Sequence, residues 1–239
     1  MILIKPQDLL HKAELLKVLT GIADDPLLSS ALYFKGGTCA TMLGYLDRFS
    51  VDLDFDLKEG SDKKKLLSKF RNIFEKLNLK IENESKRALM FILKYESPKN
   101  QRNTLKISVN EQVVKANDYE VVFLPQIDRL VNCQTVETMF ANKLVAPIDR
   151  FNKHEKIAGR DIYDINHFFS RGFDFKKEII EERTSLTIKE YIEKLIKFIE
   201  KEITETILSE DLNTLLPPEK FQKIRKTLKQ DTLIFLRSL

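Results

Sequence analysis

The spacing of hydrophobic residues predicts alternating helices and strands in the first half of the chain. Residues 8–20 carry apolar side chains near helical spacing, as expected of an amphipathic helix: Leu9, Ala13, Leu16 and Leu19. Similar patterns predict helices at 38–46 and 66–77, and strands at 32–34, 50–57, 88–95, 104–110 and 119–124. This order indicates an α+β fold with a mixed sheet and flanking helices.

The second half of the chain predicts helices alone, and we expect no strand after Pro125. The expected helices are 136–148, 161–169, 188–203 and 219–236. Thr187 and Glu190 predict a capping box at the start of the third. We therefore expect two domains, 1–125 and 126–239, with an α-helical bundle over 170–239. Helix 8–20 is a candidate to pack on the helical part.

Composition narrows this interpretation only a little. The 239 residues are 43% hydrophobic, which is enough for a sizeable core, and the net charge of +4 neither requires nor excludes a nucleic-acid partner. No apolar run approaches the roughly 18 residues of a membrane span, and no signal peptide is visible, so we expect a cytoplasmic location and no membrane partner. Two cysteines do not suffice for a disulfide framework or a zinc site, and Cys39 is expected to be a buried small side chain.

Residues 50–57 combine an apolar strand face with a row of carboxylates. The apolar residues alternate with Asp52, Asp54 and Asp56, and successive strand side chains point to opposite faces. Like charges side by side repel, so such a row indicates a bound cation rather than an acidic face open to solvent. Mg²⁺ (or Mn²⁺) at Asp52 and Asp54 fits best, because it prefers oxygen ligands. Asp56 is expected to face solvent or a basic neighbour.

A glycine pair precedes this strand. Gly36, Gly37 and Thr38 lie where the strand at 32–34 meets a short helix. Glycine lets the backbone approach a phosphate closely, and the N–H groups at a helix N-terminus attract anions. A glycine pair alone is usually a simple turn, but its place before a helix and a carboxylate strand points to a metal-bound triphosphate.

A third group of charged residues lies in the helical half. Lys143 and Arg150 are two helical turns apart, and Asp161 and Asp164 are one turn apart, so each pair shares a helix face. Lys143 is suited to compensate charge on a triphosphate, and Asp164 either to orient the nucleophile or to fix Lys143. The alternative is a cluster of surface salt bridges.

Four sequence blocks together resemble a known family. They are Lys35-Gly36-Gly37-Thr38, Arg48-x-Ser50-x-Asp52-x-Asp54, Lys143-Leu144-x-Ala146-x-x-x-Arg150 and Arg160-Asp161-x-Tyr163-Asp164. In this order they are similar to the AbiEii/AbiGii family of bacterial nucleotidyltransferase toxins, in the DNA polymerase β-like nucleotidyltransferase superfamily. The resemblance covers 35–164, about half of the chain.

The resemblance implies a polymerase β-like nucleotidyltransferase core at 1–125, followed by a helical region. It implies transfer of a nucleotide from an NTP, with Mg²⁺, to an acceptor, and characterised relatives modify the 3′ end of tRNA. Asp52 and Asp54 would bind metal, and Asp52, Asp54, Lys143 and Asp164 would be catalytic. The implied nucleotide-binding residues are Lys35, Gly36, Gly37, Thr38, Arg48, Ser50, Arg150, Arg160 and Asp161. The expected partners are an NTP, an RNA acceptor such as tRNA, and a cognate winged-helix antitoxin.

The chain departs from the family pattern in two respects. Many superfamily members add a third carboxylate from a neighbouring strand, where this chain offers Ser108 or Asn110, with Glu111 just beyond. Pro147 interrupts the helix of Lys143 and predicts that this helix kinks or ends there, followed by a loop at 152–159. Two alternatives to RNA modification therefore stay open. One is transfer to a protein or small molecule, and the other is a non-catalytic domain that binds nucleotide or a partner.

Overall fold

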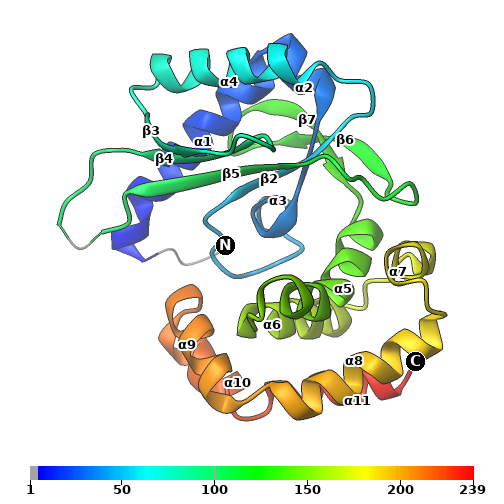
Figure 1. The fold of residues 1–239 in the computed structure, drawn as a ribbon. Helices are drawn as coiled ribbons and strands as arrows, with labels where there is room; N and C mark the ends of the chain where they lie inside the picture. The colour runs from blue at the N-terminus through cyan, green and yellow to red at the C-terminus, as the bar shows by residue number, and fades with distance from the viewer. Residues whose placement is uncertain (1–4, 100) are drawn as a thin grey trace. The chain divides into compact units, whose positions relative to one another are not determined.

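The computed structural model describes residues 5–99 and 101–239. Contacts between residues divide the chain into two compact units, coloured from blue to green and from green to red in Figure 1. The sheet unit comprises Met1–Val113 and Asp118–Gln134, and the helical unit comprises Val114–Asn117 and Thr135–Leu239.

Seven strands of the described residues form one mixed sheet, in the order β3-β4-β5-β2-β1-β7-β6. β1 runs parallel to β7, and β2 runs parallel to β5, whereas the other neighbours are antiparallel. The strands are β1 (Leu32–Lys35), β2 (Leu53–Leu57), β3 (Lys80–Glu84), β4 (Met90–Lys94), β5 (Thr104–Asn110), β6 (Tyr119–Leu124) and β7 (Arg129–Gln134). The predicted mixed sheet is confirmed.

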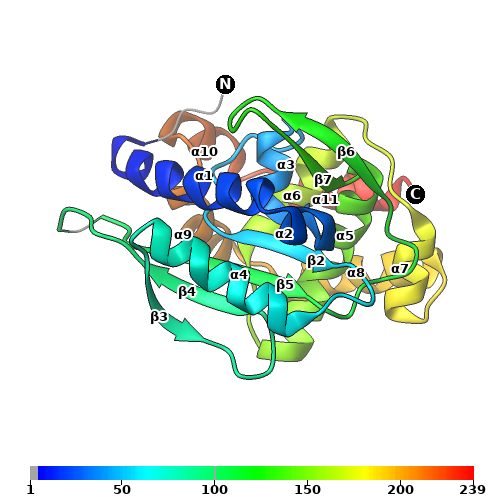
Figure 2. The same cartoon turned by 90° about the horizontal axis from the view of Figure 1, so that it is seen from above.

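One face of this sheet is covered by helices. Figures 1 and 2 show α1 (Leu9–Asp24), α2 (Pro26–Ala31) and α4 (Lys63–Lys76) on that face, with η1 (Pro6–Asp8) leading into α1. Alternate strand residues supply the core beneath them, and the rings of Phe70 and Phe74 on α4 contact Phe91 on β4. Leu9, the first residue of the predicted stripe on α1, is instead 56% exposed.

The opposite face carries the polar side chains of β1, β2 and β5. Pairing places Lys35 beside Asp54 and Asp54 beside Ser108, so these side chains share a face. α3 (Gly36–Met42) follows β1 directly and packs against β1 and β2. The glycine turn therefore lies next to the aspartate strand.

Two strands were missed from the sequence. β3 is largely exposed, with the sequence Lys-Ile-Glu-Asn-Glu, and so lacks an apolar signal. β7 follows Pro125, so the expectation of no later strand was wrong. Polar and apolar residues do not alternate regularly in its sequence, Arg-Leu-Val-Asn-Cys-Gln, so no strand is predicted there. The strand forms because β1 and β6 pair with it on either side.

The helical unit contains helices that pack on one another. They are α5 (Val136–His154), α6 (Gly159–Ser170), α7 (Lys177–Thr184), α8 (Ile188–Glu202), α9 (Glu205–Leu215), α10 (Pro218–Ile224) and α11 (Leu228–Arg237). The capping box of Thr187 and Glu190 is confirmed. The single helix expected at 219–236 is wrong, because the chain forms α10 and α11 there.

α5 does not end at Pro147. It continues to His154 and stops at Glu155, which adopts the left-handed conformation with φ 52°. Pro147 is buried within the helix, where packing outweighs the hydrogen bond that proline cannot donate. The expected loop at 152–159 is therefore shorter, since α6 begins at Gly159.

Within the described residues, no helix is both long enough and apolar enough to cross a bilayer.

Candidate active site

The glycine turn between β1 and α3 packs directly on the aspartate strand. Gly36 has φ +77°, and a Cβ at this position would lie 2.7 Å from Oδ2 of Asp54. Any larger residue would be strained in its backbone and would also collide with this carboxylate. The absence of a side chain at Gly36 therefore allows the turn and the carboxylate to approach each other.

Gly37 is enclosed in the same way by the second sequence block. A Cβ there would lie 2.7 Å from Oγ of Ser50 and 3.1 Å from Nη2 of Arg48. Arg48 is 3% exposed and donates from Nη1 to the carbonyl of Phe49 at 3.1 Å. The first and second sequence blocks therefore meet here, with Arg48 and Ser50 against Gly37.

Thr38 connects the same turn to the segment that leads into β2. Its Oγ1 donates a 2.5 Å hydrogen bond to the carbonyl of Asp52. Asp52 lies just before β2, and both it and Asp54 are half-buried. The sequence-predicted residues of the sheet unit are therefore brought together around the start of α3.

Asp54 is bound by a neutral group, because Lys35, its neighbour on β1, forms its ion pair with Asp56. Its Oδ1 accepts a 2.6 Å hydrogen bond from the hydroxyl of Ser108, and in the described part of the chain it makes no ion pair. A carboxylate held by a neutral donor is suited to a cation, and Mg²⁺ is usually held by one or two carboxylates together with substrate phosphates. The carboxylate of Asp54 therefore fits this ion.

Asp56 has a different environment, although it lies only two residues further along β2. Its side chain is fully buried, and Lys35 Nζ lies 2.5 Å from its Oδ1. Asp56 therefore faces a basic neighbour, which was one of the two expected environments, and it does not face solvent. Three neutral donors also bind its carboxylate: Asn110 Nδ2 at 2.9 Å, Tyr119 Oη at 2.9 Å and Gln134 Nε2 at 2.7 Å. We call Asp56 and these four donors the Asp56 cluster; it joins five strands of the sheet.

No third carboxylate joins Asp52 and Asp54 from the strand at 106–110. Ser108 and Asn110 face the row as expected, but they donate hydrogen bonds to Asp54 and Asp56. Glu111 forms a 2.7 Å ion pair with Lys63 on α4. Groups of three or more His, Cys, Asp or Glu side chains with metal-binding placement do not occur among the residues that the structure describes.

In the helical unit, Lys143 and Asp164 form an ion pair between α5 and α6. Lys143 Nζ lies 2.7 Å from Asp164 Oδ2, and the two side chains are 16% and 0% exposed. Of the two roles considered for Asp164, this geometry supports fixing Lys143. The cluster is not a set of surface pairs, because its carboxylates are buried.

A second pair between the same helices repeats this arrangement. Arg150 donates from Nε and Nη2 to the two carboxylate oxygens of Asp161, at 2.9 and 3.3 Å, in the two-pronged geometry of a guanidinium. Asp161 is 3% exposed in its side chain. Arg160 is half-buried in the first turn of α6.

Cys39, beside the glycine turn, is fully buried as expected. Burial raises the pKa of the Cys39 thiol well above its usual value, and the nearby Cys133 thiol adds to this shift. Such a thiol stays protonated near neutral pH, so it is a packing residue and not a nucleophile.

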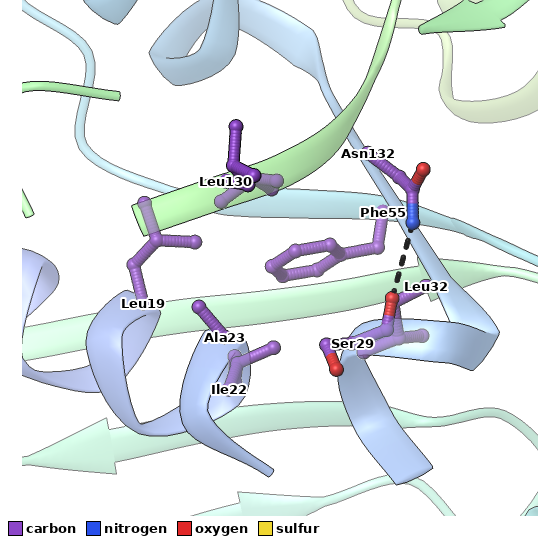
Figure 3. Close-up of a pocket in the computed structure, with 9 residues that line it drawn as sticks. Leu19, Ile22, Ala23, Ser29, Leu32, Phe55, Leu130 and Asn132 are labelled. Atoms are coloured by element: carbon purple, nitrogen blue, oxygen red, sulfur yellow. Dashed lines mark hydrogen bonds between the residues drawn. The ribbon is translucent and has the colours of Figure 1, made fainter. Parts of the chain in front are cut away.

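A small apolar hollow lies on the other face of the sheet. Figure 3 shows it between α1, α2 and β7, with Phe55 and Leu19 in its lining. The centre of a water molecule has about 10 Å³ available there, room for about one water. Phe55 points away from Asp54 and Asp56 because adjacent strand residues alternate in direction, so this hollow is separate from the candidate site.

Sequence reasoning missed two members of the Asp56 cluster. Tyr119 and Gln134 are 63 and 78 residues from Asp56, and Gln134 belongs to the unpredicted strand β7. The ring of Tyr119 also stacks on Tyr33 of β1, with centroids 3.9 Å apart. These two residues could have been placed near Asp56 if β7 had been predicted as the neighbour of β1.

Solved structures resemble this fold across nearly the whole chain. The JHP933 protein of Helicobacter pylori matches with a TM-score of 0.59 at 20% identity, covering 99% of this chain and 93% of that one. A second Helicobacter pylori structure, a candidate nucleotidyltransferase, gives 0.62 at 20% identity, covering 98% and 95%. MenT4, a nucleotidyltransferase toxin of Mycobacterium tuberculosis, gives 0.49 at 18% identity, covering 99% and 91%. The first two likenesses show the shared fold.

Sequence comparison identifies the family. No curated protein sequence matches the chain. The model of the nucleotidyl transferase AbiEii toxin family, of type IV toxin–antitoxin systems, matches residues 17–234, which include the four sequence blocks and most of both units. The chain therefore belongs to the AbiEii family of nucleotidyltransferase toxins.

Proposed function

We propose that this protein transfers a nucleotide from an NTP to an RNA acceptor, tRNA in particular, in a reaction that depends on Mg²⁺. The observation that supports this most is the packing of the glycine turn on Asp54, with Arg48 and Ser50 against Gly37. It brings a backbone suited to phosphates beside a carboxylate that lacks a basic partner. Membership of a nucleotidyltransferase family supports the reaction class.

In this proposal, the sheet unit holds the nucleotide. The phosphates bind at the start of α3, which is formed by Gly36, Gly37 and Thr38. This turn is supported by Arg48 and Ser50, which pack against Gly37. Asp52 and Asp54 hold the metal, whose chemistry when bound is to neutralise charge on the triphosphate and to lower the pKa of the attacking hydroxyl. Mn²⁺ suits the same oxygen donors.

The role of Lys35 in this proposal differs from direct contact with phosphate. Its ammonium is bound to Asp56, so it fixes the last residue of β1 immediately before the glycine turn. We propose that it contributes to nucleotide binding by holding that turn in place.

In the helical unit, Lys143 has a catalytic role in this proposal, and Asp164 fixes its ammonium. Arg150 and Asp161 support the same helix pair through their two hydrogen bonds, and Arg160 contributes a further positive charge at the start of α6. Because a buried carboxylate accompanies each of Lys143 and Arg150, their side chains are ordered before substrate binds.

A labelling experiment tests the reaction. Purified protein is incubated with Mg²⁺, each of four α-³²P-labelled NTPs and total RNA, and label is followed in RNA, protein and small acceptors. We expect label in the tRNA fraction, and we expect Asp54→Asn to remove it. Label that enters protein or a small molecule instead would contradict the acceptor, and absence of label together with absence of nucleotide binding would contradict the reaction.

We further propose that a winged-helix antitoxin accompanies the toxin, as membership of a type IV toxin–antitoxin family supports. Expression of the chain alone is expected to inhibit growth in proportion to labelling activity. Co-expression with a small winged-helix regulator encoded beside it is expected to relieve the inhibition, and persistence of the inhibition would contradict this pairing.

A further inference from the structure

The two edges of the sheet are built in opposite ways. The β3 edge carries Lys80, Glu82 and Glu84 in five residues, and its pairing with β4 shifts register between Ile81 and Asn83. Charges and bulges of this kind prevent an edge from pairing with another strand. Two ion pairs, Arg71 with Glu84 and Lys94 with Glu82, add to the charge along that edge.

The β6 edge has less of this protection. β6 pairs with β7 over six successive residues without a bulge, and its sequence Tyr-Glu-Val-Val-Phe-Leu contains one charged residue, Glu120. In the described part of the chain β7 is its neighbour on one side, and Figures 1 and 2 show β6 as an outer strand of the sheet. As the last strand of the sheet, β6 has one row of backbone groups that no strand of the described residues pairs with.

Apolar side chains gather on one face of this edge. Val121 is 62% exposed, Phe123 is 51% exposed, and Leu130 on β7 is 64% exposed. Phe123 pairs directly with Leu130, and Val121 is two residues from Phe123, so the three share a face. We call them the β6 patch. Contiguous exposed apolar residues of this kind mark interaction sites.

We propose that β6 pairs antiparallel with β6 of a second copy of this chain, in the register that places Val122 on the two-fold axis. Val121 then lies opposite the partner's Phe123. Four side chains then lie side by side across the interface, in the order Leu130, Phe123, the partner's Val121 and the partner's Asn132. The patch is complementary to itself, because each Phe123 is flanked by its own Leu130 and by a valine of the other copy.

Charge and the position of Pro125 favour this register over those centred on Glu120 and Phe123. Glu120 lies opposite the partner's Leu124, which pairs with the partner's Arg129, so two strand spacings, about 10 Å, separate the backbones of Glu120 and that arginine. Arg129 already pairs with Asp24 at 2.5 Å and is 41% exposed, so it is accessible to a second carboxylate. A register centred on Glu120 would set two carboxylates opposite each other, which is unfavourable. A register centred on Phe123 would place the partner's Pro125 opposite Val121, where proline cannot donate to the ladder.

This inference is independent of the proposed reaction, and a register-specific cross-link tests it. In Val122→Cys the two thiols face each other with Cα atoms about 4.5–5.5 Å apart, within disulfide range. Diamide accepts the two protons and two electrons as the intersubunit disulfide forms. Glu120→Cys is the matched control, since its two sulfurs lie four residues apart along the strands, about 13 Å. The native cysteines are buried.

We expect diamide to convert Val122→Cys to a covalent dimer on non-reducing gels and to leave Glu120→Cys monomeric. Sedimentation of the unmodified chain is expected to show a concentration-dependent dimer. Phe123→Lys is expected to raise the dimer dissociation constant roughly tenfold or more, whereas Ile234→Lys, at a residue of α11 that is 62% exposed, is expected to leave it unchanged. A chain that stays monomeric at its highest soluble concentration overturns the proposal. So does equal cross-linking of the two cysteine variants, and so does equal weakening by the two lysine variants.

Discussion

The acidic residues of the sheet unit and those of the helical unit are held in opposite ways. In the helical unit, Asp161 and Asp164 are buried, and each is bound by a basic residue from the same set of sequence blocks. In the sheet unit, Asp54 is half-buried and is bound by a neutral hydroxyl. Each helical carboxylate is paired with a basic side chain, whereas Asp54 is bound by a hydroxyl and is suited to bind a cation.

β2 contains both arrangements within three residues. Asp56 resembles the helical acids, because it is buried and bound by Lys35, while Asp54 on the same face is not. A buried carboxylate with four donors is costly to disrupt, and one without a basic partner is suited to bind an ion. A row of aspartates is therefore not one site, and the neighbours of each carboxylate decide its role.

The largest expected effect separates these two aspartates. Asp54→Asn is expected to lower the labelling rate by roughly a hundredfold or more, with little change in melting temperature, because it removes a metal ligand and no ion pair. Asp56→Ala is expected to lower the free energy of unfolding by about 3 kcal/mol, because the ammonium of Lys35 and three other donors lose their acceptor. Thermal melting and initial labelling rates measure both. The comparison fails if Asp54→Asn is the more destabilised variant.

The next effect concerns the ion pair of the helical unit. Lys143→Ala leaves the carboxylate of Asp164 buried without its basic partner, so we expect a loss of about 3 kcal/mol in the free energy of unfolding. Lys143→Met with Asp164→Leu is expected to be less destabilised than Lys143→Ala, because the double variant buries no charge. Arg71→Ala, which breaks a partly exposed pair with Glu84, is expected to cost less than about 1 kcal/mol. Urea titration distinguishes the three, and equal losses in Lys143→Ala and Arg71→Ala would contradict the burial argument.

These contrasts also show what the sequence could and could not predict. Asp52, Asp54 and the glycine pair were predicted to lie together, because strand alternation and a strand-to-helix turn are local patterns, and the structure places Asp54 against Gly36. The partners of Asp56 could not be predicted, because Tyr119 and Gln134 come from strands that reach it through the unpredicted neighbour β7. Which residues bind nucleotide and metal stays a prediction.

A smaller effect tests the close approach at the glycine turn. Gly37→Ala places a Cβ 2.7 Å from Oγ of Ser50, so we expect nucleotide affinity to fall about tenfold as the turn is displaced. In Gly37→Ala with Ser50→Ala the nearest remaining atom is Nη2 of Arg48 at 3.1 Å, and we expect part of the affinity to return. Isothermal titration measures both variants, and an additive loss in the double variant would contradict steric contact as the cause.

The smallest effect concerns pH and is confined to the sheet unit. His11 is 1% exposed and its Nε2 donates to the carbonyl of Val51, next to Asp52, at 2.8 Å. Burial lowers the pKa of His11 below its usual 6.5, and the hydrogen bond to Val51 only partly opposes this. Because the folded pKa is below the unfolded one, stability is fully present above pH 6.5 and falls as the pH drops below that value.

We expect the free energy of unfolding to decrease below pH 6.5 by up to about 1.4 kcal/mol per pH unit from this group. In His11→Gln the side-chain amide retains a donor for Val51 and does not titrate, so the slope is expected to be smaller. Urea titrations between pH 7.5 and 5 compare the two proteins, and identical slopes would show that His11 does not carry the effect.

The most direct test of the central claim is the binding of a nucleoside triphosphate by isothermal titration, with Mg²⁺ and then with EDTA. If Asp52 and Asp54 hold a metal beside the glycine turn, affinity should fall at least roughly tenfold when EDTA replaces Mg²⁺. Asp54→Asn should bind with the same weak affinity in both buffers, while Arg71→Ala behaves as the unmodified chain. Nucleotide bound equally well with and without the metal by the unmodified chain would contradict the account.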